Sequence, residues 1–347
     1  MNRFDDLERF PLAGIALCTA ITLSGCGGES KPLAYTAGGQ DAAGGAGGAT
    51  ADQGGAPADT ADAADGLPAL VDPADPFGPA GRVTSLKLPS SAEDAENSGC
   101  DVLGLKGGAG LAAIGRFVGE GGLQEVVTEA ADGSIGLVLL FQLAGFGHRA
   151  DDPSAPVELR AFYGDLATEP GAFSVDPTSV DAEGLSQIRW PETSLSAEGA
   201  LRTQPRTFTL TLPLGPEVPP VDLILEQALV RGQAVADGVG VRLADAHLEG
   251  YLTRDSLLTL IGDFKEACQL QPPPSFCAGL STFLNPTAPP EMTLNVLLAL
   301  VGGFDAGLDA SGPRMCTAQA RDCNAIGVCL PLETTGVRVT GLTPAMP

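Results

Sequence analysis

The chain is poor in aromatic and basic side chains. Phe, Trp and Tyr make up 5% of its 347 residues, with a single Trp, Trp190. Proteins that bind sugars or single-stranded nucleic acids stack ligands on such rings, so the scarcity argues against both classes. Nineteen Lys and Arg stand against 43 Asp and Glu, a formal charge of −24. That charge repels phosphate backbones, so no nucleic-acid partner is expected, and the acidic residues are interpreted as solvating.

Histidine is scarcer still, because only His148 and His247 occur. Serine catalysis needs a base, usually histidine, to activate the hydroxyl, and the sequence contains no G-x-S-x-G. His148 lies in a Gly-Phe-Gly-His-Arg loop, while His247 shares a predicted strand face with Asp245 and Glu249 and is expected to face solvent. Side chains two apart on a strand project in parallel, which does not suit an orienting hydrogen bond. No catalytic residue and no enzymatic activity are predicted.

Long hydrophobic runs are also missing. The apolar run at residues 11–23 has 13 residues, whereas a membrane-spanning helix needs about 20. Its length suits the apolar core of a signal peptide. Arg3 and Arg9 precede it among three acidic residues, and Leu23-Ser24-Gly25-Cys26 follows it.

That tetrapeptide resembles the lipobox of bacterial lipoproteins, and the resemblance covers residues 1–26 alone. It implies that a signal peptide, residues 1–25, is cleaved between Gly25 and Cys26. It also implies that Cys26 carries acyl chains such as palmitate and anchors the chain to a membrane. Gly27 stands where an Asp would resemble an inner-membrane retention signal. An outer-membrane location in the bacterial envelope is therefore favoured, with the leaflet left open.

Residues 26–80 are expected to be a disordered tether that follows the lipidated cysteine. They are dominated by Gly, Ala, Asp, Pro, Ser and Thr and show no periodicity of 2 or 3.6. Such a composition cannot bury enough surface to offset the entropy of ordering. A Gly-rich coil of this length spans about 40 Å, so its expected role is a spacer between lipid and domain.

Residues 81–347 are predicted to form the folded domain. Alternation indicates strands at 157–163 and 207–214, and residues 136–143 suit a central strand, apolar on both faces. Asp237-Gly238 between two apolar runs, 221–230 and 239–250, predicts a hairpin. Helical spacing predicts helices at 109–118, 121–131, 253–268 and 291–301, the third capped by Thr253. Because strands outnumber helices and mostly follow one another, the prediction is an α+β fold with a largely antiparallel sheet and a few amphipathic helices.

Six cysteines remain after Cys18 leaves with the signal and Cys26 takes lipid, namely Cys100, Cys268, Cys277, Cys316, Cys323 and Cys329. An even number in an exported chain predicts disulfides. Cys268 and Cys277 bracket a proline-rich turn and form the favoured local pair. Cys100 is expected to bond one of the last three cysteines, a staple that contributes about 4–5 kcal/mol in the chain-entropy description. Zinc is disfavoured, since the spacings of the last three lack a close pair and no His lies near them in sequence.

Two further motifs are weak. Residues 108–113 match the dinucleotide pattern G-x-G-x-x-[GA], but a poor strand precedes them and no second βαβ unit follows, so no cofactor is expected. Asp305 and Asp309 could offer oxygens to calcium, yet the spacing of a calcium-binding loop is missing. No metal site is predicted.

Three functions are consistent with these features. The first is a non-enzymatic envelope lipoprotein with a structural or partner-binding role, favoured by the tether, the disulfides and the missing chemistry. The second is a carrier of lipid or another hydrophobic ligand, because a curved sheet covered by helices can enclose an apolar cavity. The third, least favoured, is a hydrolase. Other than the membrane, an envelope protein or a hydrophobic ligand is the expected partner.

Overall fold

A computed structural model describes residues 75–89, 91–100, 122–213, 218–273, 277, 285, 287–316 and 322–344. The predicted signal peptide, Gly25, Cys26 and nearly all of the predicted tether lie outside these residues, as do the Gly-rich motif at 108–113 and the predicted helix at 109–118. The described structure begins at Asp75, just inside the stretch interpreted as a tether.

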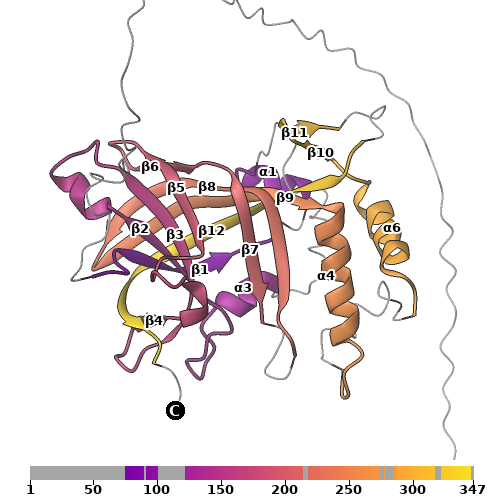
Figure 1. The fold of residues 1–347 in the computed structure, drawn as a ribbon, viewed down its shortest axis with the longest axis horizontal. Coiled ribbons are helices and arrows are strands. Elements are labelled where there is room, and N and C mark those ends of the chain that lie inside the picture. The colour runs from indigo at the N-terminus through magenta and orange to yellow at the C-terminus, as the bar shows by residue number, and fades with distance from the viewer. Residues whose placement is uncertain are drawn as a thin grey trace, which may run out of the picture. The chain divides into compact units, whose positions relative to one another are not determined.

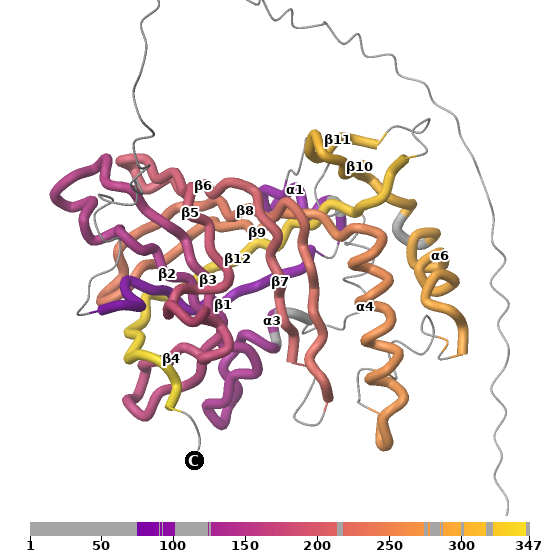
Figure 2. Tube along the Cα trace, in the orientation of Figure 1, coloured from indigo at the N-terminus to yellow at the C-terminus, as the bar shows by residue number. Residues whose placement is uncertain are grey.

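A single twelve-stranded sheet dominates the described residues, and eight of its strands close into a ring (Figures 1 and 2). Around the ring every neighbouring pair is antiparallel, and β1 closes it by pairing with both β2 and β12. In ring order the strands are β1 (Ala80–Leu86), β2 (Val138–Ala144), β3 (Val157–Leu166), β5 (Ile188–Leu195), β6 (Ala200–Thr203), β8 (Val221–Asp237), β9 (Gly240–Thr253) and β12 (Ala325–Leu342).

Four shorter strands extend the ring. β7 (Arg206–Leu212) pairs with the first half of β8, and β4 (Ala172–Val175) bridges β3 and β12. β10 (Ala306–Asp309) and β11 (Gly312–Met315) form a small hairpin beside β12. The strand predicted at 207–214 is confirmed as β7, with Phe208 and Leu210 buried on one face.

The predicted α+β class is wrong, because the sheet dominates the described residues and the helices are few and short. The prediction of a largely antiparallel sheet is confirmed. An open sheet needs helices to cover its apolar face, whereas a closed sheet covers that face with its own opposite strands. The helices therefore became peripheral elements instead of a second layer.

The inside of the ring is a packed core. Alternate residues of the ring strands point inward, as Leu139, Phe141 and Leu143 do on β2. At its centre Trp190 stacks on Phe208, with ring centroids 5.7 Å apart, and lies 6.4 Å from Phe141. The indole N–H of Trp190 donates to the carbonyl of Ala228 at 3.1 Å, so its one polar atom is satisfied. The carrier hypothesis expected a cavity inside the sheet, but large side chains fill this space.

Two longer helices lie at one end of the ring (Figure 1). α4 (Arg254–Ala267) starts where β9 ends, and its Leu257 and Ile261 join the interior cluster. α6 (Pro290–Val301) packs beside α4 and contributes Leu294 to the same cluster. Both agree with the predicted helices at 253–268 and 291–301.

The described residues also contain two short α-helices. The helix predicted at 121–131 is shorter than expected and forms α3 (Gly122–Val127), and α1 (Ala92–Asn97) was not predicted. Among the described residues no helix is long and apolar enough to cross a membrane.

The predicted hairpin is confirmed as β8–β9, but its turn lies one residue further along. Asp237 pairs with Gly240, which leaves Gly238 and Val239 as the two turn residues. Gly238 has a φ of 59° and Val239 has no positive φ, as in a two-residue turn with glycine first. This tip projects at the end of the ring opposite α4, because α4 follows the other end of β9.

Candidate functional site

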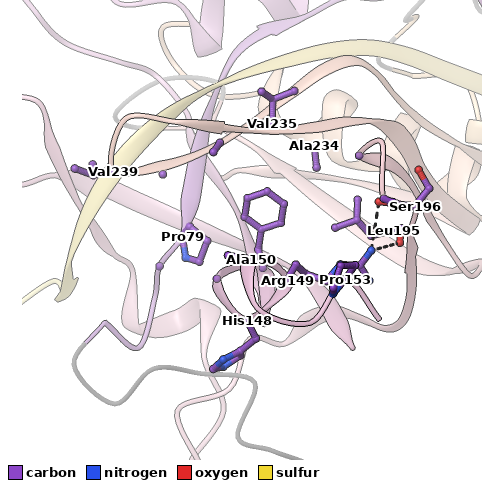
Figure 3. Close-up of a pocket in the computed structure, with 18 of the residues that line it drawn as sticks. Pro79, His148, Arg149, Ala150, Pro153, Leu195, Ser196, Ala234, Val235 and Val239 are labelled. Atoms are coloured by element: carbon purple, nitrogen blue, oxygen red, sulfur yellow. Dashed lines mark hydrogen bonds between the residues drawn. The ribbon is translucent and has the colours of Figure 1, made fainter. Parts of the chain in front are cut away.

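The end of the ring opposite α4 carries a cavity of about 950 Å³ (Figure 3). Four segments that are far apart in the sequence surround it, and each leads into or out of a ring strand. They are the stretch before β1 (Asp75, Gly78, Pro79), the β2–β3 connection (Gly145–Ala150, Pro153), the β5–β6 turn (Leu195–Gly199) and the β8–β9 tip (Ala234–Ala236, Gly238–Gly240). Its volume lies in the range of small-molecule sites.

Apolar groups dominate the walls of this end pocket. Leu195 and Phe146 pack against the interior core and form its deep side. Val235 and Val239 line it from the β8–β9 tip, and Val239 is 69% exposed. Pro79 faces them from the stretch before β1 (Figure 3). An exposed valine at a turn tip gains stability when an apolar partner covers it, so the walls favour an apolar occupant.

Arg149 supplies positive charge to the wall. It lies on the short 3-10 helix η1 (Phe146–Ala150), which follows Gly145 with a φ of 81°. The guanidinium donates to the carbonyls of Ala155 at 3.1 Å and Leu195 at 2.6 Å, and so ties the β2–β3 connection to the β5–β6 turn. Within the described part of the chain no carboxylate lies within 4 Å of it. A third carbonyl, that of Ser196, accepts from the guanidinium at 3.3 Å, and the charge also interacts electrostatically with Asp152.

Backbone contacts hold the surrounding segments in place. The amide of Gln142 donates to the carbonyls of Pro76 and Gly78, both at 3.0 Å, and fixes the stretch before β1. Gly199 approaches β8 so closely that a Cβ there would lie 2.6 Å from the carbonyl oxygen of Ala234. The N–H of Ala234 in turn donates to the Gly199 carbonyl at 2.8 Å. The pocket is therefore shaped by rigid strand ends and is largely preformed.

A second cluster of chemical groups is buried on the outer face of the ring. The Cys100–Cys329 disulfide crosses from the segment after α1 to β12, and His247 and Glu249 lie beside it on β9. One ligand atom from each of Cys100, His247 and Cys329 lies within 4.8 Å of the other two. Arg231 donates from Nε to Glu249 at 2.6 Å and from Nη2 to the Gly99 carbonyl at 2.5 Å.

The expectation that His247 faces solvent is wrong. His247 is only 6% exposed, and Glu249 only 7%, because α1 and the segment up to Cys100 cover this part of β9. Asp245 does not share their face, since it has a φ of 47° and lies unpaired where the β8–β9 register shifts. Such a bulge inserts one residue and breaks the alternation on which the expectation depended.

All three disulfides form between the predicted six cysteines. Cys268 bonds Cys277, as the favoured local pairing predicts, and Cys100 bonds Cys329, as expected for a long-range staple. The third pair is Cys316–Cys323. Six cysteines allow fifteen connectivities, and the sequence favoured a local Cys268–Cys277 pair with Cys100 bonded to one of the last three. The fold selects Cys329 as that partner because β12 carries it next to the segment that ends at Cys100.

The remaining candidates do not converge on a site. His148 is exposed at the edge of the end pocket (Figure 3). Asp305 accepts the Gly327 N–H at 2.8 Å, and Asp309 accepts the Ser311 N–H at 2.8 Å and pairs with Arg314. Both carboxylates that could offer oxygens to calcium are thus engaged with groups of the protein, and in the described residues neither belongs to a three-ligand group.

No protein-family model, no curated protein and no solved structure matches this chain. The end pocket and the buried cluster are therefore interpreted from their chemistry alone.

Proposed function

We propose that this protein is a lipid-anchored binding protein of the bacterial envelope that holds a small amphipathic ligand in its end pocket. The proposed ligand has an apolar body, such as an acyl chain, and one acidic group. The proposal involves no catalytic step. The observation that carries it is a mainly apolar cavity with the guanidinium of Arg149 in its wall, which has no carboxylate within 4 Å among the described residues.

The placement of the pocket supports a ligand that is only partly enclosed. The ring interior is filled around Trp190 and offers no room for a deeply buried chain. The apolar body would lie against Leu195, Val235 and Val239, and its acidic group would meet Arg149. A charge-assisted hydrogen bond to an arginine is roughly twice as strong as a neutral one, which favours a carboxylate over an alcohol.

The ligand's chemistry can be tested without changing the protein. Titration calorimetry of the full chain with dodecanoate and with dodecanol compares the same chain length with and without charge. We expect both to bind, with the carboxylate tighter by about tenfold, the equivalent of 1.4 kcal/mol. Equal affinities would remove the role given to Arg149, and absence of binding by either would reject the amphipathic ligand.

A blocking substitution locates the binding. Gly147 lines the pocket, has an ordinary φ, and a Cβ there meets nothing within 4 Å, so Gly147→Trp places bulk at the pocket without backbone strain. We expect at least roughly tenfold weaker binding of dodecanoate. Gly262→Trp is the matched control, because Gly262 has the same open space but lies on α4, away from the pocket. Equal loss in both variants would place the ligand elsewhere.

Membrane attachment rests on the lipobox resemblance at residues 23–26. We expect the full chain made in a bacterium to enter the membrane fraction and to incorporate labelled palmitate. Cys26→Ser should abolish the labelling and release the protein, since one modified residue carries the acyl chains. Cys18→Ser, within the predicted signal, is the control and should change neither. Membrane retention of the Cys26→Ser chain would contradict the anchor without affecting the pocket.

A further inference from the structure

We infer that Cys100, Cys329 and His247 form a zinc site when the disulfide between the two cysteines is reduced. The disulfide and the zinc complex are then alternative states of one buried site on the outer face of the ring. This site is separate from the end pocket and does not depend on the proposed function. Three side chains from different parts of the chain meet there, with their ligand atoms within 4.8 Å of one another.

The imidazole of His247 has one ring nitrogen without a hydrogen-bond partner among the described residues. Its Nε2 lies 2.5 Å from the carbonyl oxygen of Ser98. A carbonyl can only accept, so Nε2 carries the proton and Nδ1 carries a lone pair. Nδ1 is buried and has no hydrogen-bond partner among the described residues. Metal-binding histidines characteristically donate their other N–H to a carbonyl or carboxylate, which sets the tautomer and the ring orientation.

A buried nitrogen lone pair without a hydrogen-bond partner destabilises the fold, because it has lost its contact with water and gained none in return. A metal ion bound at Nδ1 would remove that cost. Soft thiolate ligands combined with imidazole select zinc among the common divalent cations. In tetrahedral zinc sites with S and N ligands the ligand atoms lie about 3.3–3.8 Å apart, so the two sulfurs must move apart once their bond is reduced, while His247 is already within reach.

The disulfide is converted to the zinc complex in two steps, reduction followed by metal binding. A dithiol reductant gives two electrons and two protons to the Cys100–Cys329 bond and becomes a disulfide itself, leaving two thiols. Binding of Zn²⁺ then displaces both thiol protons to solvent, and His247 adds its neutral lone pair. Two thiolates cancel the charge of the ion, so the complex is neutral, which suits two cysteines that are 0–1% exposed. Three protein ligands leave the fourth position to water.

The side chains around the site hold the backbone next to Cys100 in place without the disulfide. Arg231 pairs with Glu249 and also binds the Gly99 carbonyl, so it holds the backbone next to Cys100 in place when the disulfide opens. The Ser98 carbonyl stays bonded to His247 in both states. The segment that ends at Cys100 therefore keeps two anchors to β8 and β9 after the covalent bond is lost.

The test uses the full chain with only one cysteine pair left. Serine replaces the other six cysteines, namely Cys18, Cys26, Cys268, Cys277, Cys316 and Cys323. After reduction with a phosphine, which does not compete for the metal as a dithiol does, the chain is titrated with Co²⁺ and then Zn²⁺ without oxygen. We expect one Co²⁺ per chain with thiolate charge-transfer and tetrahedral absorption bands, displaced by one Zn²⁺. The oxidised chain should bind neither.

His247→Gln separates the site from adventitious binding to two thiols. Glutamine can still donate to Ser98 but lacks the imidazole lone pair, and we expect Zn²⁺ affinity to fall by at least roughly 100-fold. His148→Gln, at the other histidine, is the control and should leave the affinity unchanged. Equal affinity in the parent and in His247→Gln, or no binding by the reduced parent, would overturn the inference.

A second measurement decides the matter if the six-serine chain does not fold. The unaltered full chain is reduced, and alkylation of each cysteine is followed by mass spectrometry with and without one equivalent of Zn²⁺. We expect selective protection of Cys100 and Cys329. Protection of Cys268 and Cys277 or of Cys316 and Cys323 instead would place the zinc elsewhere and reject the site.

Discussion

Trp190 organises the interior through both its size and its indole N–H. It is 1% exposed, stacks on Phe208 and donates to the Ala228 carbonyl on β8. Truncation would leave a large cavity and an unsatisfied carbonyl in the middle of the ring. Trp190 is the single Trp of an aromatic-poor chain, and that scarcity concentrates the core packing on a few rings.

We predict that Trp190→Ala lowers the free energy of unfolding by about 3–5 kcal/mol, the range for truncating a large buried aromatic residue. Urea unfolding followed by far-UV circular dichroism measures it. Val239→Ala is the control, because that side chain is 69% exposed and should change stability by less than about 0.5 kcal/mol. A loss of under 1 kcal/mol for Trp190→Ala would contradict the packed interior.

Asp305 links stability to pH. Burial raises its pKa above the ordinary 3.8, although the Gly327 N–H donates to its carboxylate and opposes that shift. Between the unfolded and the folded pKa the folded chain binds more protons than the unfolded one, so this residue's contribution increases stability as the pH falls through that window. Above the folded pKa the ionised buried carboxylate costs stability in full.

We therefore predict that Asp305→Asn is more stable than the parent at pH 7, and that the difference shrinks as the pH falls toward 4. Asparagine keeps an oxygen that can accept from Gly327 but carries no charge. Unfolding free energies of both chains, measured by urea at several pH values, give the difference curve. A difference that does not vary with pH would show that Asp305 titrates normally.

At the scale of elements, the start of α4 is stabilised by the residue that precedes it, Thr253. The Thr253 hydroxyl accepts the Ser256 N–H at 3.2 Å, which satisfies one of the free N–H groups at the helix start. This cap was predicted from sequence because capping is a contact between near neighbours. The helix in turn buries Leu257 and Ile261 against the end of the ring.

We predict that Thr253→Ala destabilises the fold by about 1 kcal/mol, the usual cost of losing a threonine cap. Thr259→Ala is the matched control. It makes the same change at an exposed position inside α4, where alanine is the better helix former, so it should be neutral or slightly stabilising. Thermal or urea unfolding compares them, and equal effects of the two changes would remove the role of the cap.

At the scale of the molecule, the two ends of the described chain are joined twice. β1 pairs with β12 through residues such as Val83 and Thr334, and Cys100 is bonded to Cys329 across 229 positions. The first link closes the ring between its first and last strands, and the second ties the segment after α1 to the last strand. The Cys268–Cys277 bond spans nine positions and constrains only the segment after α4.

We predict that Cys100→Ser with Cys329→Ser costs more stability than Cys268→Ser with Cys277→Ser. Loop-closure entropy alone gives about 5 kcal/mol for the long staple and about 3 kcal/mol for the short one. Urea unfolding of the two double variants tests the order. If the short pair were the costlier one to remove, local strain and contacts would outweigh the entropy of the unfolded chain.

Sequence by itself determined the local features of this protein: the alternation of β7, the cap of α4, the β8–β9 hairpin and the Cys268–Cys277 pair. Each depends on residues close together in the chain, so their pattern is visible without the fold. Only the tertiary structure decided that the sheet closes, since the pairing of β1 with β12 joins residues about 250 positions apart. Closure brings four separate segments around one pocket, and the segment from α1 to Cys100 buries His247 beside a disulfide on the outer face. Both sites consist of side chains that meet only through contacts between distant parts of the chain.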